Sequence, residues 1–324
     1  MDIPNERSSH SVPTPRGGGI GIVVAFLLAF LALSRRVVMP SNLNWALVGG
    51  GLTLAVEGLL DDRFLLSVRV RIIIHTAAAA WALWQLNGAA PLNIGAVALV
   101  WWWTRELIAL VGLVWMINLY NFMDGIDGLA GTEALCVSGF GGLLLFRCGF
   151  GGMAQGAWAL AAASAGFLVW NWPPAKIFMG DAGSGFLGFV FGVFTISSAI
   201  ERPWMLWPWS ILLSVFIVDS TVTLLLRWVN RARWYEAHCS HAYQHAARRW
   251  NSHGRVTIAI AVINVVWLFP LAYAACVWQT GGPLLAAIAG VPLVLLEVWY
   301  NAGRESSPMK TLSSNSSFRI GAEV

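Results

Sequence analysis

Ten apolar stretches, separated by short polar segments, limit this chain to a fold in which helices cross a membrane. A bilayer needs roughly 20 helical residues to be crossed, and several of the stretches are a few residues shorter than that. The expected spans are residues 19–34, 45–60, 70–86, 96–120, 129–146, 153–170, 185–199, 205–227, 256–278 and 284–300. The predicted fold class is therefore all-α, a polytopic helical bundle embedded in a membrane.

The composition agrees with this fold class. Charged residues make up only 11% of the 324 residues, whereas a soluble domain has about 25%. The 19 tryptophans fit a membrane protein, because indole rings favour the membrane interface. The net charge of +4 does not indicate a nucleic-acid partner, since the charges are scattered between the spans. The four cysteines have no CxxC spacing, which predicts free thiols.

Both ends of the chain are polar. The first 18 residues do not have the pattern of a cleavable signal peptide. We expect residues 1–303 to form one membrane-embedded domain and the Ser-rich residues 304–324 to form a disordered cytoplasmic tail.

The basic residues are distributed unequally over the two faces of the predicted bundle. Ten alternating spans place both termini on one face, and that face holds 15 of the 20 lysines and arginines. The positive-inside rule makes it the cytoplasmic face. The dense polar clusters all follow even-numbered spans and fall on the same face. This asymmetry favours an enzyme at the cytoplasmic surface over a transporter, whose polar groups lie near the midplane.

The segment between the fourth and fifth spans contains Asn118, Asn121, Asp124 and Asp127, together with two glycines. Carboxylates at membrane depth are costly and mark functional sites. The alternative is a solvated turn between helices, in which Asp-Gly is common. If the segment is helical, Asp124 and Asp127 share one face. Two carboxylates there could accept hydrogen bonds from a nucleobase or a ribose.

Two further segments carry aspartates that could hold a metal ion. Asp61 and Asp62 follow the second span, and at a helix end they could straddle a cation. Asp181 lies in a glycine-flanked turn entering the seventh span, where backbone N–H groups suit a phosphate. Hard oxygen ligands without a nearby cysteine favour Mg²⁺, with Mn²⁺ as the alternative. For Asp181 alone, a helix N-cap is an equally good interpretation.

The polar segment after the eighth span contains His238, His241 and His245, with Arg248 one turn further. These side chains share one face if residues 236–249 are helical. A stripe of histidine and arginine suits a diphosphate. A zinc site is one alternative, with Cys239 nearby, and a basic segment resting on anionic lipid headgroups is another. Asp219 lies within the eighth span and is a candidate structural partner of the site.

The polar segments together resemble the polyprenyl-phosphate N-acetylhexosamine-1-phosphate transferase superfamily, which includes phospho-N-acetylmuramoyl-pentapeptide transferase. The matching stretches are PNERSSHSVPTPRGGG, GLLDDR, NLYNFMDGIDGLAG, NWPPAKIFMGDAGSGFLG and HCSHAYQHAARR. The last stretch is most similar to the branch that initiates O-antigen synthesis, and it departs from the triple-histidine loop of the muramoyl branch. Family members usually carry one more helix before the first stretch, for eleven spans.

The resemblance implies a reaction in a bacterial inner membrane. A phosphate oxygen of undecaprenyl phosphate attacks the β-phosphate of a UDP-N-acetylhexosamine, UMP leaves, and a lipid-diphospho-sugar forms. It further implies roles for residues of this chain. Asp61 and Asp62 match the aspartate-rich motif that lies near the metal and the lipid phosphate. In the family, one of these two aspartates is proposed as a general base, and this role is disputed. Asp181 matches the aspartate that binds Mg²⁺. The nucleotide-sugar side is formed by Asn118, Asn121, Asp124, Asp127, Asn171 and Lys176, and the loop over the diphosphate and sugar by His238, His241, His245 and Arg248.

Two alternatives to a transferase stay open from the sequence. The first is a transporter of a nucleotide sugar or a lipid-linked sugar, and the second is an inactive scaffold of a glycan-assembly complex. The oligomeric state is also open, since the chain could form a homodimer. The identity of the sugar does not follow from the residues.

Overall fold

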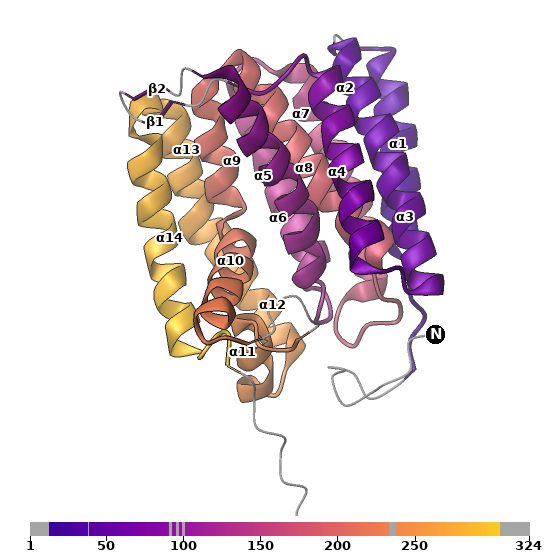
Figure 1. The fold of residues 1–324 in the computed structure, drawn as a ribbon, viewed down its shortest axis with the longest axis vertical. Coiled ribbons are helices and arrows are strands. Elements are labelled where there is room, and N and C mark those ends of the chain that lie inside the picture. Colours follow the sequence, from indigo (N-terminus) through magenta and orange to yellow (C-terminus); the bar gives the residue numbers. More distant parts are fainter. Residues whose placement is uncertain are drawn as a thin grey trace, which may run out of the picture.

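The computed structural model describes residues 13–37, 39–90, 93–94, 97–98, 101–232 and 238–304. In these ranges the chain forms a bundle of helices that run roughly side by side (Figure 1). The PNERSSH part of the first motif and the predicted tail from residue 305 onward lie outside the described residues.

The helices of the first half of the chain are α1 (Gly19–Ser34), α2 (Ser41–Trp45), α3 (Gly51–Phe64), α4 (Val68–Gln85), α5 (Trp102–Phe122), α6 (Leu129–Arg147) and α7 (Gly151–Asn171). Those of the second half are α8 (Asp181–Glu201), α9 (Leu206–Leu212), α10 (Ser214–Val229), α11 (Ala242–Trp250), α12 (His253–Val262), α13 (Phe269–Val277) and α14 (Gly282–Trp299). A π-helical segment joins α2 to α3 (Ala46–Gly50), and another joins α12 to α13 (Ile263–Leu268). A two-stranded antiparallel pair, β1 (Asn93–Ile94) and β2 (Val97–Ala98), precedes α5.

The all-helical fold and its membrane character are confirmed, whereas the number of spans stays a prediction. Within the described ranges, six helical stretches are long and apolar enough to cross a membrane. A seventh is obtained if Pro203–Leu212 and Ser214–Val229, which meet at 77°, form one broken span. The expected spans at α1, α4 and α5 are not among these stretches. Helix α1 has only 16 residues. Helices α4 and α5 are less apolar overall, because each carries charged residues near its start.

Helix α8 lies at the centre of the bundle. Within the most apolar 18-residue stretch of α8, 89% is buried inside the protein. This share is larger than in any other apolar span of the described chain. The side chains of Phe186, Phe189, Phe191 and Phe194 are fully buried. A helix that is apolar on all sides is enclosed by other helices, and α3 and α5 pack along α8.

Small residues bring three helices into backbone contact. Gly58 of α3 packs against the backbone of Ala182, and Gly19 of α1 packs against the backbone of Gly183. Glycine and alanine at helix interfaces allow backbones to approach closely. The start of α1 and the second half of α3 are therefore fixed against the first turn of α8, which begins at Asp181.

The predicted polar segments gather at one end of the bundle, where α11 and the N-terminal described residues also lie (Figure 1). The strand-like residues before α1 pair with the loop before α8. The N–H groups of Gly17 and Gly18 donate to the Phe178 carbonyl at 3.1 and 2.8 Å, and the Phe178 N–H donates to Pro15 O at 2.8 Å. This pairing carries Arg16 to the start of α8.

Candidate active site

Aspartates from α3 and α8 meet on one arginine. Arg16 Nε lies 2.9 Å from Asp62 Oδ1, and Arg16 Nη2 lies 2.6 Å from Asp181 Oδ1. The Asp181 backbone N–H also donates to Asp62 Oδ1 at 3.3 Å. The two carboxylates, 119 residues apart in sequence, are thus direct neighbours at the end of the bundle.

A second arginine, from the first turn of α4, binds the other aspartate of the pair. Arg71 Nη1 lies 3.0 Å from Asp61 Oδ2 and 3.8 Å from Asp181 Oδ2. Its Nε lies 3.9 Å from Oε1 of Glu57, which is buried in α3. We refer to Arg16, Asp61, Asp62, Arg71 and Asp181 as the carboxylate cluster.

Local geometry explains why neighbouring aspartates take different partners. Consecutive helical residues point about 100° apart, so Asp61 faces Arg71 while Asp62 faces Arg16. Gly180, with φ of +78°, turns the chain into α8. A Cβ at Gly180 would lie 2.5 Å from Asp62 Oδ2. Asp181 is the first residue of α8 and Gly180 is the N-cap, so the N-cap interpretation of Asp181 is wrong.

The donor set of the carboxylate cluster fits a divalent cation that shares its ligands with phosphate oxygens. Among the described residues, no three His, Cys, Asp or Glu side chains are grouped as a metal site of their own. Asp62 Oδ2, however, is buried without a hydrogen-bond partner in the described chain. Mg²⁺ is bound by one or two carboxylates plus substrate phosphates, so two adjacent aspartates with one unpaired oxygen are sufficient protein ligands.

Two asparagines of α5 extend the cluster. In the amide orientation that satisfies all its neighbours, Asn121 Nδ2 donates to Asp181 Oδ1 at 3.1 Å, and Asn121 Oδ1 accepts from Arg71 Nη2 at 2.7 Å. Asn118, one turn earlier, lies with its Nδ2 3.2 Å from His75 Nδ1. His75 Nε2 in turn lies 3.5 Å from Glu57 Oε2. Asn121 therefore contacts the cluster directly, and Asn118 contacts it through buried polar residues.

The expectation that Asp124 and Asp127 share one helical face is wrong. Helix α5 ends at Phe122 and α6 begins at Leu129, because the intervening turn contains two glycines and Gly128 has φ of +77°. Asp127 Oδ1 lies 3.3 Å from His253 Nδ1, and Asp127 Oδ2 accepts from the Ala175 N–H at 3.0 Å. The two aspartates thus face different neighbours.

Asp124 belongs electrostatically to the carboxylate cluster. Burial, together with the nearby Asp181 and Asp62 charges, raises the pKa of Asp124 to about 8. The Arg16 charge and a hydrogen bond from the Gly180 backbone act in the opposite direction. Asp124 therefore carries a proton for much of the time at neutral pH, and it can donate a hydrogen bond.

Asn171 and Lys176 lie beside the cluster rather than in it. Asn171 is buried, with Oδ1 accepting from the Gly128 N–H and Nδ2 donating to Ile177 O, both at 2.9 Å. Its amide joins the turn before α6 to the loop before α8. Lys176 Nζ lies 5.6 Å from the centre of the Trp170 ring. Their predicted roles in nucleotide-sugar binding stay predictions.

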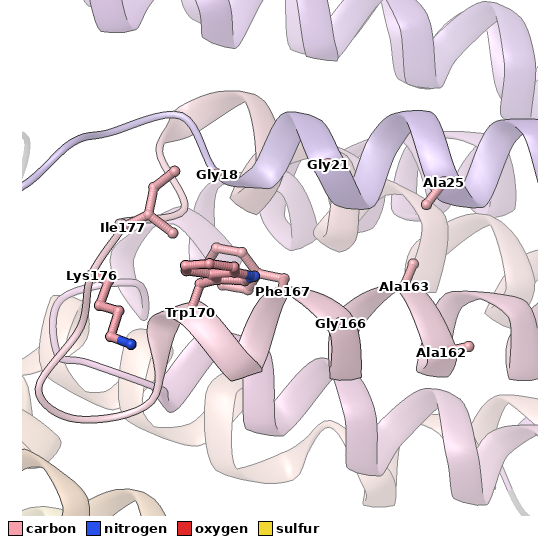
Figure 2. A pocket seen from close by; sticks show the side chains of 10 residues that line it. All are labelled: Gly18, Gly21, Ala25, Ala162, Ala163, Gly166, Phe167, Trp170, Lys176 and Ile177. Atoms are coloured by element: carbon pink, nitrogen blue, oxygen red, sulfur yellow. The ribbon is translucent and has the colours of Figure 1, made fainter.

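Lys176 stands at the end of an apolar groove between α1 and α7. Figure 2 shows the groove, whose volume is about 580 Å³, with Trp170 and Phe167 at the end near Lys176. Its remaining lining consists mainly of small residues: Gly18, Gly21, Ala25, Ala162, Ala163, Gly166 and Ile177. The groove is an apolar surface that adjoins the loop before α8, through Lys176 and Ile177.

The histidine segment, defined as residues 238–250, is held by one buried carboxylate. Asp219 Oδ1 lies 2.9 Å from His241 Nδ1, and Asp219 Oδ2 accepts from the Tyr243 N–H at 3.0 Å. The expected helical stripe is wrong at its start, because α11 begins at Ala242 and His241 is its N-cap. Residues 236–237 lie outside the described residues. The His238 and His241 rings are nevertheless 5.0 Å apart.

The environment of His238 keeps that ring neutral. Burial, followed by the nearby His241 and the Arg227 charge, lowers the pKa of His238 to about 3, although the Asp219 charge acts against this shift. His238 Nδ1 lies 3.1 Å from Ser240 Oγ. At neutral pH the ring can therefore bind a ligand through hydrogen bonds but contributes no charge.

The last two residues predicted for this loop, His245 and Arg248, lie on the side of α11 that faces α14. They line a cavity of about 350 Å³ against the end of α14. The opposite side of α11 contacts α5, where the Tyr243 hydroxyl donates to Phe122 O at 2.9 Å. The His241 ring lies 6.2 Å from the Phe122 ring and so faces α5. His245 and Arg248 face α14 instead, although Arg248 Nη2 still donates to Cys239 O at 2.9 Å.

Sequence reasoning did not place Arg16 or Arg71 against the aspartates, and it named Asp219 only as a candidate structural partner of the site, without identifying His241 as the residue that Asp219 binds. Arg71 and Asp219 carry a signal that could have been used. Arg71 and Asp219 are ionisable residues within or at the ends of apolar helices, and such residues are paired in membrane proteins. Arg16 lies in the PRGGG motif, whose pairing with Phe178 is a contact across 162 residues that no local pattern reveals.

Comparisons with known proteins agree with the resemblance seen in the sequence. The family described as Glycosyl transferase family 4 matches residues 44–199. A decaprenyl-phosphate N-acetylglucosaminephosphotransferase of Mycolicibacterium smegmatis is 31% identical, over 60% of this chain and 52% of the relative. A probable undecaprenyl-phosphate N-acetylglucosaminyl 1-phosphate transferase of Bacillus subtilis is 26% identical, over 82% and 75%. A phospho-N-acetylmuramoyl-pentapeptide-transferase of Moorella thermoacetica is 30% identical, over 58% and 62%. The match to the first of these relatives spans about half of its length.

Proposed function

Because the chain belongs to the polyprenyl-phosphate N-acetylhexosamine-1-phosphate transferase superfamily, we propose that it transfers N-acetylhexosamine-1-phosphate from a UDP-sugar to undecaprenyl phosphate. The products are undecaprenyl-diphospho-sugar and UMP. The observation that carries this proposal is the carboxylate cluster, in which Asp62 and Asp181 share Arg16 next to a buried, unpaired carboxylate oxygen. Such a site suits two phosphorylated substrates that must be brought together.

In the proposed reaction, a phosphate oxygen of the lipid bonds to the β-phosphorus of the UDP-sugar. The bond from that phosphorus to the bridging oxygen breaks, and the oxygen leaves with UMP. Transfer of this kind depends on positioning and on stabilising negative charge more than on proton transfer. A phosphate monoester is already largely ionised, so no aspartate is required as a base.

The chain supplies positive charge and orientation to this reaction. Arg16 and Arg71 are planar donors that suit phosphate oxygens, and both stand at the carboxylates. Asp62 and Asp181 would hold Mg²⁺, or Mn²⁺, which when bound neutralises charge on the diphosphate. Asn121 lies beside Asp181 and can orient the nucleotide. Protonated Asp124 can donate to an acceptor atom of the base or ribose.

We further propose that this site faces the cytoplasm of a bacterium, at the inner membrane. The excess of basic residues on the face that carries the polar segments supports this orientation. Lipid phosphates lie at the headgroup level while their tails stay in the bilayer, which suits a site at the ends of helices. The proposed product initiates synthesis of O-antigen or of another surface polysaccharide. The relatives named for N-acetylglucosamine support UDP-N-acetylglucosamine as the first donor to test.

A UMP-release assay tests the proposed function. The purified full chain is given undecaprenyl phosphate, Mg²⁺ and each of a panel of UDP-N-acetyl sugars. We expect UMP and a lipid-linked sugar to form in equal amounts with at least one donor. Reactions without the lipid phosphate are the control for simple hydrolysis. Absence of UMP with every donor, together with movement of a UDP-sugar across sealed vesicles, would favour the transporter alternative.

A further inference from the structure

A polar cavity lies between α11 and the end of α14, and the proposed reaction does not use it. Its volume is about 350 Å³. The lining residues are His245, Arg248, Arg249, Trp299, Tyr300 and Asn301. None of these six residues is acidic, so the lining of the cavity is basic and aromatic.

Two guanidinium groups provide that charge. Arg248 Nη2 donates to Cys239 O at 2.9 Å, and Arg249 lies over the Tyr300 ring with its Cζ 6.0 Å from the ring centre. Each guanidinium has five N–H donors, so both can donate further hydrogen bonds into the cavity. Burial lowers the pKa of His245 below its ordinary value, and the Arg248 charge adds to this effect. The cations of the cavity at neutral pH are therefore the two arginines.

The residues around the cavity have the pattern of a membrane interface. Trp299 and Tyr300 end the last apolar span, and Trp299 is 67% exposed. Tryptophan and tyrosine gather where the hydrocarbon core meets the headgroups. Helix α11 buries Ala242, Tyr243, Ala246 and Ala247 and exposes its arginines. An amphipathic helix with arginines on its outer face is typical of the headgroup region.

The cavity is separate from the carboxylate cluster. The side of α11 that carries Tyr243 contacts the end of α5, beside Asn121. The side that carries His245 and Arg249 contacts α14. A ligand in the cavity and a substrate at the cluster would thus lie on opposite sides of α11. Because α11 also follows the loop containing His241, a ligand here could stabilise the position of that loop.

We propose that this cavity binds the phosphodiester headgroup of an anionic membrane phospholipid. The two guanidinium groups match phosphate oxygens, and the aromatic rings place the site at headgroup depth. The ligand is a lipid of the surrounding bilayer rather than a substrate. The inference therefore does not depend on the proposed transferase activity.

Lipid binding to the purified full chain tests the proposal. Phosphatidylglycerol and, separately, phosphatidylcholine are titrated into detergent-solubilised protein, and bound lipid is counted by native mass spectrometry. We expect phosphatidylglycerol to bind more tightly than phosphatidylcholine. Arg249→Gln should weaken phosphatidylglycerol binding about tenfold, the size of one charge-assisted hydrogen bond. Arg255→Gln is the matched control, since Arg255 is an exposed arginine of α12 outside the cavity.

Two results would overturn the proposal. The first is equal binding of phosphatidylglycerol by wild type and Arg249→Gln, when both unfold at the same temperature. The second is complete displacement of the lipid by millimolar inorganic phosphate, which would make this a site for free anions. Because Arg249 is exposed, the variant is expected to fold. UMP release is measured in parallel but does not decide the outcome, so failure of the transferase proposal stays distinguishable.

Discussion

The carboxylate cluster and the histidine segment lie at the same end of the bundle, yet they are positioned by different forces. The carboxylate cluster sits where helix backbones touch, at Gly58 against Ala182 and Gly19 against Gly183. The histidine segment packs Tyr243, Ala246 and Ala247 into the core, but its start is held by hydrogen bonds that converge on the single buried side chain of Asp219. The first arrangement is fixed by packing over several helices, whereas the start of the histidine segment, where His241 lies, depends on one carboxylate.

This difference indicates a division of tasks. A metal and two phosphates need ligands that do not move, and close packing of α1, α3 and α8 provides them. A loop that admits and releases a nucleotide sugar benefits from fewer contacts, because regions with few apolar contacts open at low free-energy cost. We therefore expect changes in the cluster to remove activity, and changes at Asp219 to reduce it.

The largest effect is expected from Asp181→Asn. The amide keeps the size of the side chain but removes the charge that faces Arg16 and Arg71. We expect UMP release to fall by about a thousandfold, the order seen when a main source of electrostatic stabilisation is lost. Glu201→Gln, at the opposite end of the same helix, is the control and should keep wild-type activity. Wild-type turnover in Asp181→Asn would exclude this residue from the reaction.

A smaller effect is expected from Asp219→Asn. This change weakens the bond to His241 Nδ1 while leaving the carboxylate cluster intact. We expect kcat to fall about tenfold to a hundredfold, as when a group that orients a functional histidine is lost. The pH dependence of kcat should also change, which a purely structural role would not require. Thr223→Val, which removes one donor to Asp219, is the matched control and should have the smaller effect.

If Asp219→Asn instead abolished activity as fully as Asp181→Asn, the contrast between the two regions would be lost. The histidine segment would then be part of the reaction centre itself. Equal thermal unfolding temperatures of the two variants are needed for this comparison.

Most helices and the three aspartates of the carboxylate cluster could be predicted from the sequence. The reason is that Asp61, Asp62 and Asp181 lie at the ends of apolar stretches. An apolar stretch that crosses the membrane places the polar residues at its ends on the membrane surface. The arginines could not be assigned in this way. Arg16 reaches the cluster only because residues before α1 pair with Phe178, and pairing of distant segments leaves no periodic signal.

The histidine segment was predicted less well for a related reason. Spacing alone suggested one helical stripe through His238, His241 and His245. The chain instead starts α11 after His241, where Asp219 accepts hydrogen bonds from the first N–H groups of that helix. A helix start determined by a side chain from another helix is not visible in the local sequence. Similarly, Asp124 and Asp127 lie in the turn between α5 and α6, where Gly128 has a positive φ, so no helix runs through them to place both on one face.

A moderate effect on stability is expected from Gly58→Ala. A Cβ at this position would collide with the backbone of Ala182, so α3 must shift from α8. Overpacking of this kind costs about 1–3 kcal/mol. The thermal unfolding temperature should fall, and activity should fall with it because Asp62 moves. Gly166→Ala is the matched control, since nothing lies within 4 Å of its Cβ position. Equal unfolding temperatures for the two variants would contradict backbone contact at Gly58.

The smallest effect concerns the pH dependence of stability at Asp124. The pKa of Asp124 is about 8 in the folded chain, above its ordinary value of 3.8. The folded state thus keeps a proton that the unfolded chain releases above pH 4, so stability declines between pH 4 and pH 8. We expect Asp124→Asn to reduce the difference between the unfolding temperatures at pH 5 and pH 8.5. Glu201→Gln, an exposed carboxylate at the other end of α8, should keep the wild-type difference. An unchanged difference in Asp124→Asn would show that burial does not hold this proton, and Asp124 would then face substrate as a carboxylate.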